Sequence, residues 1–333
     1  MPPQREPPRI LIVGAGVAGL TAAQSLHNSG FTVSVVDKGR APGGRISSRN
    51  GDIGPFDHGA QYFTARDPRF IARVQAWKAA GVVKAWQGRI GVALRGDLTA
   101  KKEEQPARFV GVPSMRAIAL HQARMLDVRN GVRISKLMRK DDRWHAEVSK
   151  GEAPAPADAV IITAPSEQAT ELLAPAPALA AAAGRVHHAP CWAVMVAFDT
   201  AIDVPFDGLF VHESPLSWVA RDTAKPGRPA GERWVLHGGP AWSEAHLEDD
   251  ADDVAKGLLD AFFAAVGVKP VAPTYLKGHR WRYAIAEPPI DRGHLFDTDL
   301  KIGAAGDWLH GARVEGAYLS GISVASQVRE AFG

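Results

Sequence analysis

The sequence predicts an α/β protein: a Rossmann-like dinucleotide-binding domain that includes a β-meander, followed by a second α+β domain with a mixed sheet. Three observations support this prediction. A β-branched run near the start passes into a glycine-rich turn, the next strand ends in a carboxylate, and a Gly-Asp turn near the end precedes a helix of small residues. With 333 residues, the chain has room for roughly two domains.

The first observation concerns residues 10–19, whose sequence is ILIVGAGVAG. Gly14 permits a tight turn, Gly16 lets a pyrophosphate approach the backbone, and Gly19 lets the next helix pack closely on the strand. The start of that helix directs free N–H groups and a positive dipole end at the phosphates. Because 33 glycines produce chance matches to this motif, its context decides its meaning.

The context agrees with a dinucleotide site. Residues 20–28 form a plausible amphipathic helix, residues 32–36 read as a second strand, and Asp37 stands 18 residues after Gly19. A ribose-binding carboxylate is expected about 20 residues after the motif. Asp37 favours a free ribose 2′-hydroxyl, because a 2′-phosphate would repel it. These residues leave open whether the dinucleotide carries nicotinamide or flavin.

The composition of the chain argues against several kinds of binding partner. The net charge is +3 and the basic residues are scattered, so nucleic acid is not an expected partner. Cys191 is the single cysteine, which excludes an internal disulfide and a multi-cysteine metal site. The N-terminal segment has no apolar signal-peptide core, and no run approaches the about 18 apolar residues of a spanning helix. We therefore expect a cytoplasmic protein with no metal and no membrane contact.

Two polar stretches follow Asp37. Residues 38–45, KGRAPGGR, are glycine-rich and basic, which suits a second phosphate-facing loop. Residues 57–64, DHGAQYFT, combine an acid, an imidazole, an amide and a phenol. Their small residues would let the backbone touch a planar ring, while Gln61 and Tyr62 offer hydrogen-bond donors and an aromatic face. His58 taken alone is more typical of a structural hydrogen-bonder than of a base.

The rest of the chain divides into recognisable elements. We expect helices at 68–80, 115–126, 174–184 and 250–266, with a last helix running to about residue 331. Strands are expected at 82–94, 108–110, 132–138 and 144–148 (a β-meander), 158–163, 192–198, 209–211, 218–221, 234–237, 275–283 and 300–304. After the last strand, Gly306 and Asp307 begin a second helix N-terminus suited to an anionic group.

At this point the chain resembles a known family. GAGVAG with Asp37, GGR at 43–45 and the terminal GDW…EGA…SG resemble the glutathione-reductase-type FAD fold of the amine oxidase superfamily. Within it, the chain is similar to the bacterial renalase-like FAD-dependent oxidoreductases through FDHGAQYFT (56–64), FVGVPSM (109–115), HRWRYA (279–284) and GDWLHGARVEGAYLSG (306–321). The resemblance covers essentially the whole chain. It implies an FAD-binding domain of residues 1–66, 112–166 and 299–333, and a substrate domain of residues 67–111 and 167–298.

The resemblance also assigns cofactor contacts and favours flavin over nicotinamide. It implies that the pyrophosphate lies at Gly14, Ala15, Gly16, Ala18 and Gly19. The adenosine ribose would lie at Asp37 and Lys38, and adenine at the Val132 backbone. The ribityl chain would lie at Asp307, and the flavin pyrimidine edge at Val314, Glu315 and Ala317. Arg45 would neutralise phosphate, and further contacts are expected from Gly44, Gly59, Ala60, Gln61 and Gly306. A terminal Cys-Gly-Gly motif is missing, which implies non-covalent FAD.

The activity implied by the resemblance is oxidation of 2- or 6-dihydro isomers of NAD(P)H, with hydride transfer to flavin N5 and dioxygen as acceptor, producing hydrogen peroxide. Such transfer depends on stacking and orientation rather than on a strong base. Our candidates for the substrate pocket are Gln61, Tyr62, Trp192, His237, Arg280, Trp281 and Trp308. One alternative is an oxidase or desaturase of an amine or other small metabolite, with Lys277 or His237 as base. Another is a non-catalytic FAD-binding protein.

Overall fold

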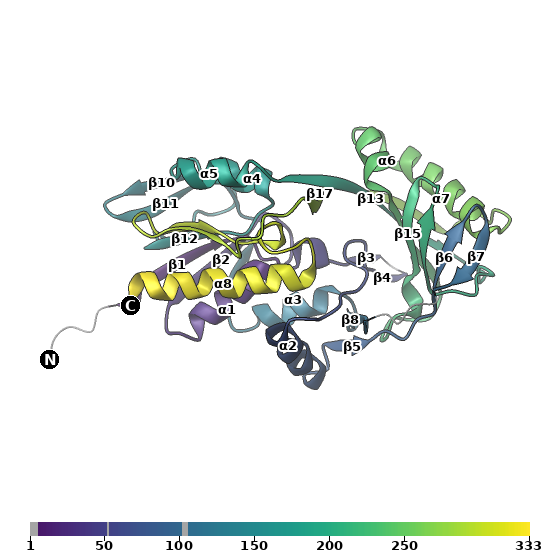
Figure 1. Ribbon diagram of the computed structural model, residues 1–333, viewed down its shortest axis with the longest axis horizontal. Helices are drawn as coiled ribbons and strands as arrows, with labels where there is room; N and C mark the ends of the chain where they lie inside the picture. The colour runs from purple at the N-terminus through teal and green to yellow at the C-terminus, as the bar shows by residue number, and fades with distance from the viewer. Residues whose placement is uncertain (1–5, 52, 102–105) are drawn as a thin grey trace.

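The computed structural model describes residues 6–51, 53–101 and 106–333, and a six-stranded sheet organises its first half (Figure 1). The strand order is β18-β19-β12-β1-β2-β9. Five strands run parallel and β18 is antiparallel to its neighbour: β1 (Arg9–Val13), β2 (Thr32–Asp37), β9 (Asp127–Asn130), β12 (Ala159–Ile162), β19 (Ile302–Ala304) and β18 (Leu295–Asp297). The Rossmann-like prediction is therefore confirmed.

Alternating side chains of this sheet enter two separate cores. Ile10 and Ile12 pack toward the helices of one face, while Leu11 between them packs toward the other. The first face is covered by α1 (Val17–His27), α3 (Arg116–Ala123) and α8 (Val314–Phe332), and the second by the hairpin β10 (Arg133–Lys140)–β11 (Arg143–Lys150) with α4 (Ser166–Leu172) and α5 (Pro177–Ala183). The strand predicted at residues 158–163 is β12, and all four of its residues are buried. It pairs with β1 on one side and β19 on the other.

A seven-stranded sheet organises the second half, in the order β17-β13-β16-β15-β14-β6-β7. The pair β14–β6 is parallel and the other pairs are antiparallel, which confirms the predicted mixed sheet. The strands are β6 (Ile90–Leu94), β7 (Asp97–Ala100), β13 (His187–Phe198), β14 (Gly208–His212), β15 (Leu216–Arg221), β16 (Glu232–Gly238) and β17 (Tyr275–Glu287). α6 (Pro240–Ala245) and α7 (Ala251–Val266) lie on its outer side in Figure 1.

Helix α7 shows why this segment folds as it does. Asp250 caps its first turn by accepting hydrogen bonds from the N–H groups of Asp252 and Asp253. Gly267 ends it in a left-handed conformation with φ +68°. Between these signals, Leu258 and Phe262 are fully buried against the outer face of the sheet. The inner face is left to meet the rest of the chain.

The structure differs from the sequence prediction in several elements. Residues 82–94 form two strands, β5 (Val83–Ala85), which pairs with β8 (Phe109–Gly111), and β6, which joins the large sheet. β9 was not predicted, because its sequence DVRN carries no apolar run and only its pairing with β2 identifies it. Helix α4 was also not predicted, and the expected helix at 174–184 is the shorter α5.

The predicted domain division also differs from the packing at helix α2 (Pro68–Ala79). Residues 67–111 were assigned to the substrate domain, yet Phe70, Val74 and Trp77 of α2 pack in the core beneath the first sheet. The rings of Phe70 and Tyr318 of α8 lie 5.1 Å apart. Within the described residues, no helix is both long and apolar enough to cross a membrane.

Candidate active site

The glycine-rich turn after β1 is tied to two other loops. Gly14 adopts φ +115°, a conformation that L side chains rarely adopt. The Asp37 carboxylate accepts hydrogen bonds from the N–H of Ala15 (2.7 Å) and of Gly39 (2.6 Å). The N–H of Gly43 donates to the Ala15 carbonyl at 2.8 Å. The turn, the end of β2 and the 43–45 loop therefore form one cradle.

The residues of this cradle fit a dinucleotide. A Cβ placed on Gly16 would meet nothing within 4 Å, so the space in front of the turn is open. Ala18 lies buried in α1 directly behind it. The predicted backbone contact of Val132 with adenine would use its carbonyl, because its N–H donates to the Asp37 carbonyl at 2.9 Å. Lys38 lies at the same edge, with its Nζ 2.9 Å from Gln168 Oε1 of α4.

Arg45 joins the cradle to the C-terminal Gly-Asp turn. Its Nη1 donates to Asp307 Oδ2 at 2.9 Å and its Nη2 to Asp307 Oδ1 at 2.5 Å, the two-pronged geometry that arginine forms with a carboxylate. Nη1 also donates to the Ala284 carbonyl of β17 at 2.9 Å. Asp307 opens the short helix η3 (Asp307–Leu309), and the N–H of Gly306 donates to Ser320 Oγ at 2.9 Å. The two predicted cofactor segments thus meet, although they lie far apart in sequence.

The 57–64 loop docks directly on Arg45. The N–H of Ala60 donates to the Arg45 carbonyl at 2.9 Å. A Cβ on Gly59 would lie 2.1 Å from the same carbonyl oxygen, so only glycine allows this approach. The loop predicted to lie beside the flavin is therefore held against the loop predicted to bind phosphate.

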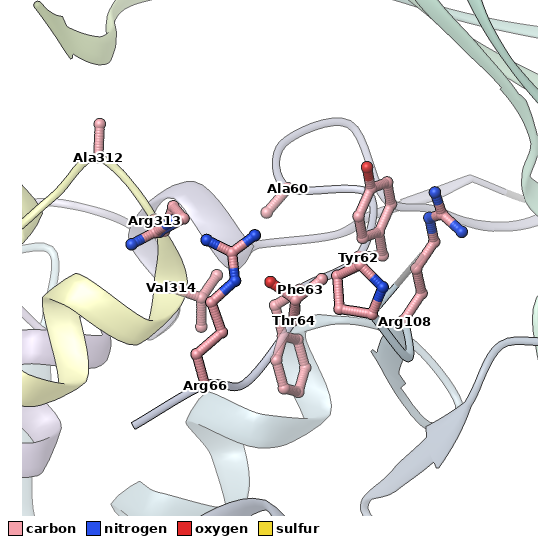
Figure 2. Close-up of a pocket in the computed structure, with 10 residues that line it drawn as sticks. Ala60, Tyr62, Phe63, Thr64, Arg66, Arg108, Ala312, Arg313 and Val314 are labelled. Atoms are coloured by element: carbon pink, nitrogen blue, oxygen red, sulfur yellow. The ribbon is translucent and has the colours of Figure 1, made fainter. Parts of the chain in front are cut away.

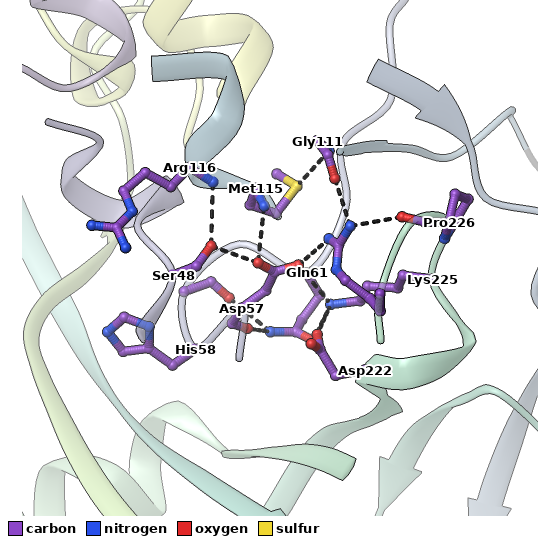
Figure 3. Close-up of polar contacts among 12 residues, drawn as sticks. Ser48, Asp57, His58, Gln61, Gly111, Met115, Arg116, Asp222, Lys225 and Pro226 are labelled. Carbon is purple, nitrogen blue, oxygen red and sulfur yellow. Dashed lines mark hydrogen bonds and ion pairs between the residues drawn. The ribbon is translucent and has the colours of Figure 1, made fainter. Parts of the chain in front are cut away.

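A buried ion cluster holds the same loop from the opposite side (Figure 3). Lys225 Nζ lies 2.6 Å from Asp222 Oδ1 and 3.4 Å from Asp57 Oδ2, and Arg228 also contacts Asp57. All four side chains are fully buried. Burial raises the pKa of Asp57, but Lys225 and Arg228, with hydrogen bonds from Ser48 and the Met115 N–H, hold it below its usual value.

Gln61 belongs to this cluster rather than to the substrate pocket, which corrects our prediction. Its Nε2 donates to the carbonyls of Asp57 and, at 3.1 Å, Gly59, while its Oε1 accepts from Lys225 Nζ at 3.1 Å. These contacts fold the amide inward and leave it buried. Gln61 therefore shapes the loop and does not offer its donors to a bound ring.

Three histidines and a tryptophan gather where β16 and β17 face the loop. His237 and His279 both pair with Ala193 of β13, so they flank one small residue on the same sheet face. The ring centroids of His58 and His279 lie 4.7 Å apart, and those of His58 and Trp281 lie 5.0 Å apart. The His58 carbonyl accepts from Trp281 Nε1 at 2.9 Å and lies 3.2 Å from His237 Nε2.

The histidines of this group are neutral. Burial, followed by repulsion from Arg49 and from His279 whenever that ring is protonated, lowers the pKa of His58 to about 3. Burial likewise lowers the pKa of His237 to about 4 and that of His279 to about 4. A carbonyl only accepts, so His237 Nε2 must carry the proton in its contact with the His58 carbonyl. The predicted site residues His237 and Trp281 thus lie beside the loop as uncharged hydrogen-bond donors.

Three other predicted pocket residues lie elsewhere. For Trp192 and Arg280 the reason is that alternate residues of a strand face opposite sides of a sheet, whereas Trp308 lies in η3. Trp192 packs in the core under α7 and donates from Nε1 to the His246 carbonyl at 2.9 Å. Arg280 lies over the Trp192 ring and pairs with Glu248 on the outer surface. Trp308 is fully buried behind the first sheet, with its Nε1 3.1 Å from the Ala164 carbonyl.

Lys277 is also remote from the pocket. Its Nζ lies 3.4 Å from Asp252 Oδ1 at the start of α7, and half of its side chain is exposed. The lysine that we considered as a base is therefore engaged on the outer surface of the second sheet.

A cavity of about 410 Å³ opens beside the 57–64 loop (Figure 2). Tyr62 and Phe63 line it from the loop, and Val314 lines it from the first turn of α8, where Ala317 follows one turn later. The complete lining is Ala60, Tyr62, Phe63, Thr64, Arg66, Pro106, Arg108, Ala312, Arg313 and Val314. Of our predicted pocket residues, Tyr62 is the one found in this lining.

The side chain of Glu315, in the turn of α8 predicted to lie at the flavin edge, is engaged within the protein. Its Oε1 accepts from the N–H of Arg66 at 2.6 Å and of Asp67 at 2.8 Å, and the residue is only 4% exposed. Glu315 therefore ties the start of α2 to the first turn of α8, beside the cavity.

Sequence reasoning missed several residues of the site. Lys225 and Arg228 lie in a Pro-Gly-containing turn whose local sequence, AKPGR, carries no sign of burial. Arg66 and Arg108 stand outside every motif that we identified, whereas Arg313 lies inside the 306–321 segment and could have been noted there. His279 belongs to the HRWRYA segment but was passed over for its neighbours.

Comparisons with known proteins agree with this geometry. Residues 12–76 match a family model described as an NAD(P)-binding Rossmann-like domain, and residues 72–329 match one described as flavin containing amine oxidoreductase. Hydroxyneurosporene desaturase of Rubrivivax gelatinosus is 45% identical over 58 residues, which is 17% of this chain and 11% of that protein. Lysine-specific histone demethylase 1 homolog 1 of Oryza sativa is 49% identical over 49 residues, 15% of this chain and 6% of that protein. The matched region is thus a small part of these relatives.

Solved structures share the fold over nearly the whole chain. A putative protoporphyrinogen oxidase from Exiguobacterium superposes with a TM-score of 0.79 at 12% identity, covering 97% of this chain and 99% of that one. Cyclohexylamine oxidase from Brevibacterium oxydans superposes with a TM-score of 0.75 at 13% identity and the same coverage. The α/β fold with two large sheets is therefore shared with these two oxidases.

The buried ion cluster leads to a stability prediction. Replacing Lys225 with Met leaves two buried carboxylates without their shared cation, so we expect the free energy of unfolding to fall by about 3–5 kcal/mol. Urea denaturation would measure it. Lys256→Met is the matched control, because Lys256 also pairs with an aspartate three residues earlier, but on an exposed surface. It should change stability by less than about 1 kcal/mol. Equal losses in the two variants would show that the cluster does not hold the loop.

The neutral histidines lead to a second prediction, on pH. Their folded-state pKa values lie below the ordinary 6.5, so between about pH 6.5 and 4 the unfolded chain binds protons that the folded chain does not. Stability should therefore fall as the pH falls through this window. His237→Gln should make the dependence of the melting temperature on pH less steep, while His212→Gln, at an exposed position, should not. An unchanged slope in His237→Gln would contradict the assignment.

Proposed function

The chain belongs to the flavin-containing amine oxidoreductase family, and from its site we propose that it is a renalase-like oxidase of 2- or 6-dihydro isomers of NAD(P)H. FAD is its cofactor, and the segments that would hold it are the glycine turn, Asp37, the 43–45 loop, Asp307 and the start of α8. Bound FAD supplies a two-electron acceptor that takes a hydride from the substrate and passes the electrons to dioxygen, giving hydrogen peroxide. We propose non-covalent binding, because the single cysteine of the sequence, Cys191, is buried in β13 of the second sheet.

One observation carries the proposal. Among the described residues that line the cavity, none is a carboxylic acid, a histidine, a lysine or a cysteine. Oxidation of a dihydronicotinamide ring needs no proton acceptor, because loss of the hydride alone gives the aromatic pyridinium. A cavity whose described lining offers an aromatic face but no such proton acceptor suits this reaction.

The side chains around the cavity would orient the ring. Tyr62 presents its ring at the cavity and is itself packed against Trp218, with centroids 5.5 Å apart. The neutral state of His237 and His279 also matters, because the substrate ring becomes positively charged as it loses its hydride. Protonated imidazoles nearby would oppose that change.

Oxidation of an amine is the second candidate, since the family contains amine oxidases, but two observations argue against it. The lysine considered as its base, Lys277, is paired with Asp252 on the outer surface, and His237 Nε2 is a donor in its contact with a carbonyl.

Anaerobic mixing tests the proposal. The 2- and 6-dihydro isomers of NAD(P)H should bleach the bound flavin rapidly, and Lys277→Met should bleach at the same rate as the wild type. Isomers that leave the flavin yellow, while an amine from a test panel bleaches it, would overturn the proposal in favour of amine oxidation. Failure of every reductant, with a full complement of FAD, would instead identify a non-catalytic FAD-binding protein.

A further inference from the structure

We infer that Arg66, Arg108 and Arg313 form a subsite for the phosphate nearest the substrate's nicotinamide ring, so that the site selects nucleotides over nucleosides. This inference rests on the proposed function and names the substrate group that the site recognises. Its starting observation is that these arginines line the same cavity as Tyr62 and Phe63 (Figure 2).

Two of the arginines are placed by the first turn of α8. Arg313 is the N-cap residue of that helix, and its carbonyl accepts from the N–H of Ala317 at 3.0 Å. Arg66 is fixed to the same turn because its backbone N–H donates to the buried carboxylate of Glu315 at 2.6 Å. The carboxylate of Glu315 thus holds the backbone of Arg66 close to the turn that begins after Arg313.

The third arginine approaches from the loop side. The Arg108 guanidinium carbon lies 5.2 Å from the centre of the Tyr62 ring, within the range of a cation–π contact. Its Nε is buried and has no hydrogen-bond partner among residues 6–51, 53–101 and 106–333. A buried donor without an acceptor is costly, and a ligand oxygen in the cavity would satisfy it.

The charge of the cavity favours an anion. Within the part of the chain that the structure describes, none of the three guanidinium groups lies within 4.0 Å of a carboxylate, whereas Arg45 is paired with Asp307 and Arg95 with Glu213. The cavity lining itself contains no carboxylate among these residues. Three like charges around one space repel each other, and a phosphate with several acceptor oxygens offsets that repulsion.

The position of the arginines identifies which phosphate they would bind. The reacting ring must lie near Ala60 and Tyr62 if it is to meet the flavin, and the arginines border the same space. The first phosphate after the ribose is the one within reach. The adenylate half of a dinucleotide is then unnecessary for recognition, so a mononucleotide should bind nearly as well as the dinucleotide.

Equilibrium binding to the FAD-loaded protein tests this with two unreactive probes, nicotinamide mononucleotide and nicotinamide riboside, which differ by one phosphate. We expect the mononucleotide to bind at least about tenfold more tightly. Arg66→Gln, Arg108→Gln and Arg313→Gln should each weaken mononucleotide binding by about tenfold and leave riboside binding unweakened. The corresponding lysine variants should recover part of the loss, because they keep the charge.

The matched control is Arg95→Gln, which removes the same charge from an exposed turn far from the cavity lining and should leave both affinities unchanged. Equal affinities for the two probes would overturn the inference. So would arginine variants that change the FAD content or the flavin midpoint potential without changing phosphate discrimination, because the arginines would then serve the cofactor. Bleaching of the flavin by the dihydro isomers is measured separately. The proposed function is therefore tested independently of this inference.

Discussion

The buried ion cluster around Asp57 is the constraint on which the arrangement of this protein depends. Asp57 comes from the glycine-rich half of the chain, while Lys225, Asp222 and Arg228 come from the turn between β15 and β16 of the second sheet. Charges this deeply buried are stable only when each has its partner, so the two halves must meet in one relative position. The Gln61 amide extends the cluster into the loop that lines the cavity.

The consequence is a loop held on both sides. The Arg45 carbonyl accepts a hydrogen bond from the N–H of Ala60 and lies close to Gly59, while the ion cluster holds Asp57 of the same loop. Because Arg45 also binds Asp307, the cradle, the Gly-Asp turn and the loop are linked to one another. The protein thus contributes shape and charge to the cavity, and the chemistry remains with the flavin.

Much of the fold could be predicted from local sequence, and the parts that could not be predicted depend on distant partners. Local spacing alone identifies the glycine turn, Asp37 and the Gly-Asp turn as cofactor-binding motifs. Both ends of the predicted cofactor site could therefore be recognised from the sequence. β9 is visible only through its pairing with β2, and the burial of Lys225 only through carboxylates far away in the chain. The assignment of Trp192, Arg280 and Trp308 to the substrate pocket was wrong, because the sequence does not tell which side of a sheet or core a residue faces. The assignment of Gln61 to the pocket was wrong, because its side-chain amide donates hydrogen bonds within the loop itself.

The central claim is that this site orients a ring for hydride loss without a proton acceptor. The most direct measurement is the rate constant of anaerobic flavin bleaching at saturating 6-dihydro-NADP, followed from pH 6 to 9. Our account predicts a flat profile, because His58, His237 and His279 are already neutral throughout this range and the described residues of the cavity lining include no carboxylate, lysine or histidine. A rate constant that rises about tenfold through a single ionisation would reveal a required base and contradict the account.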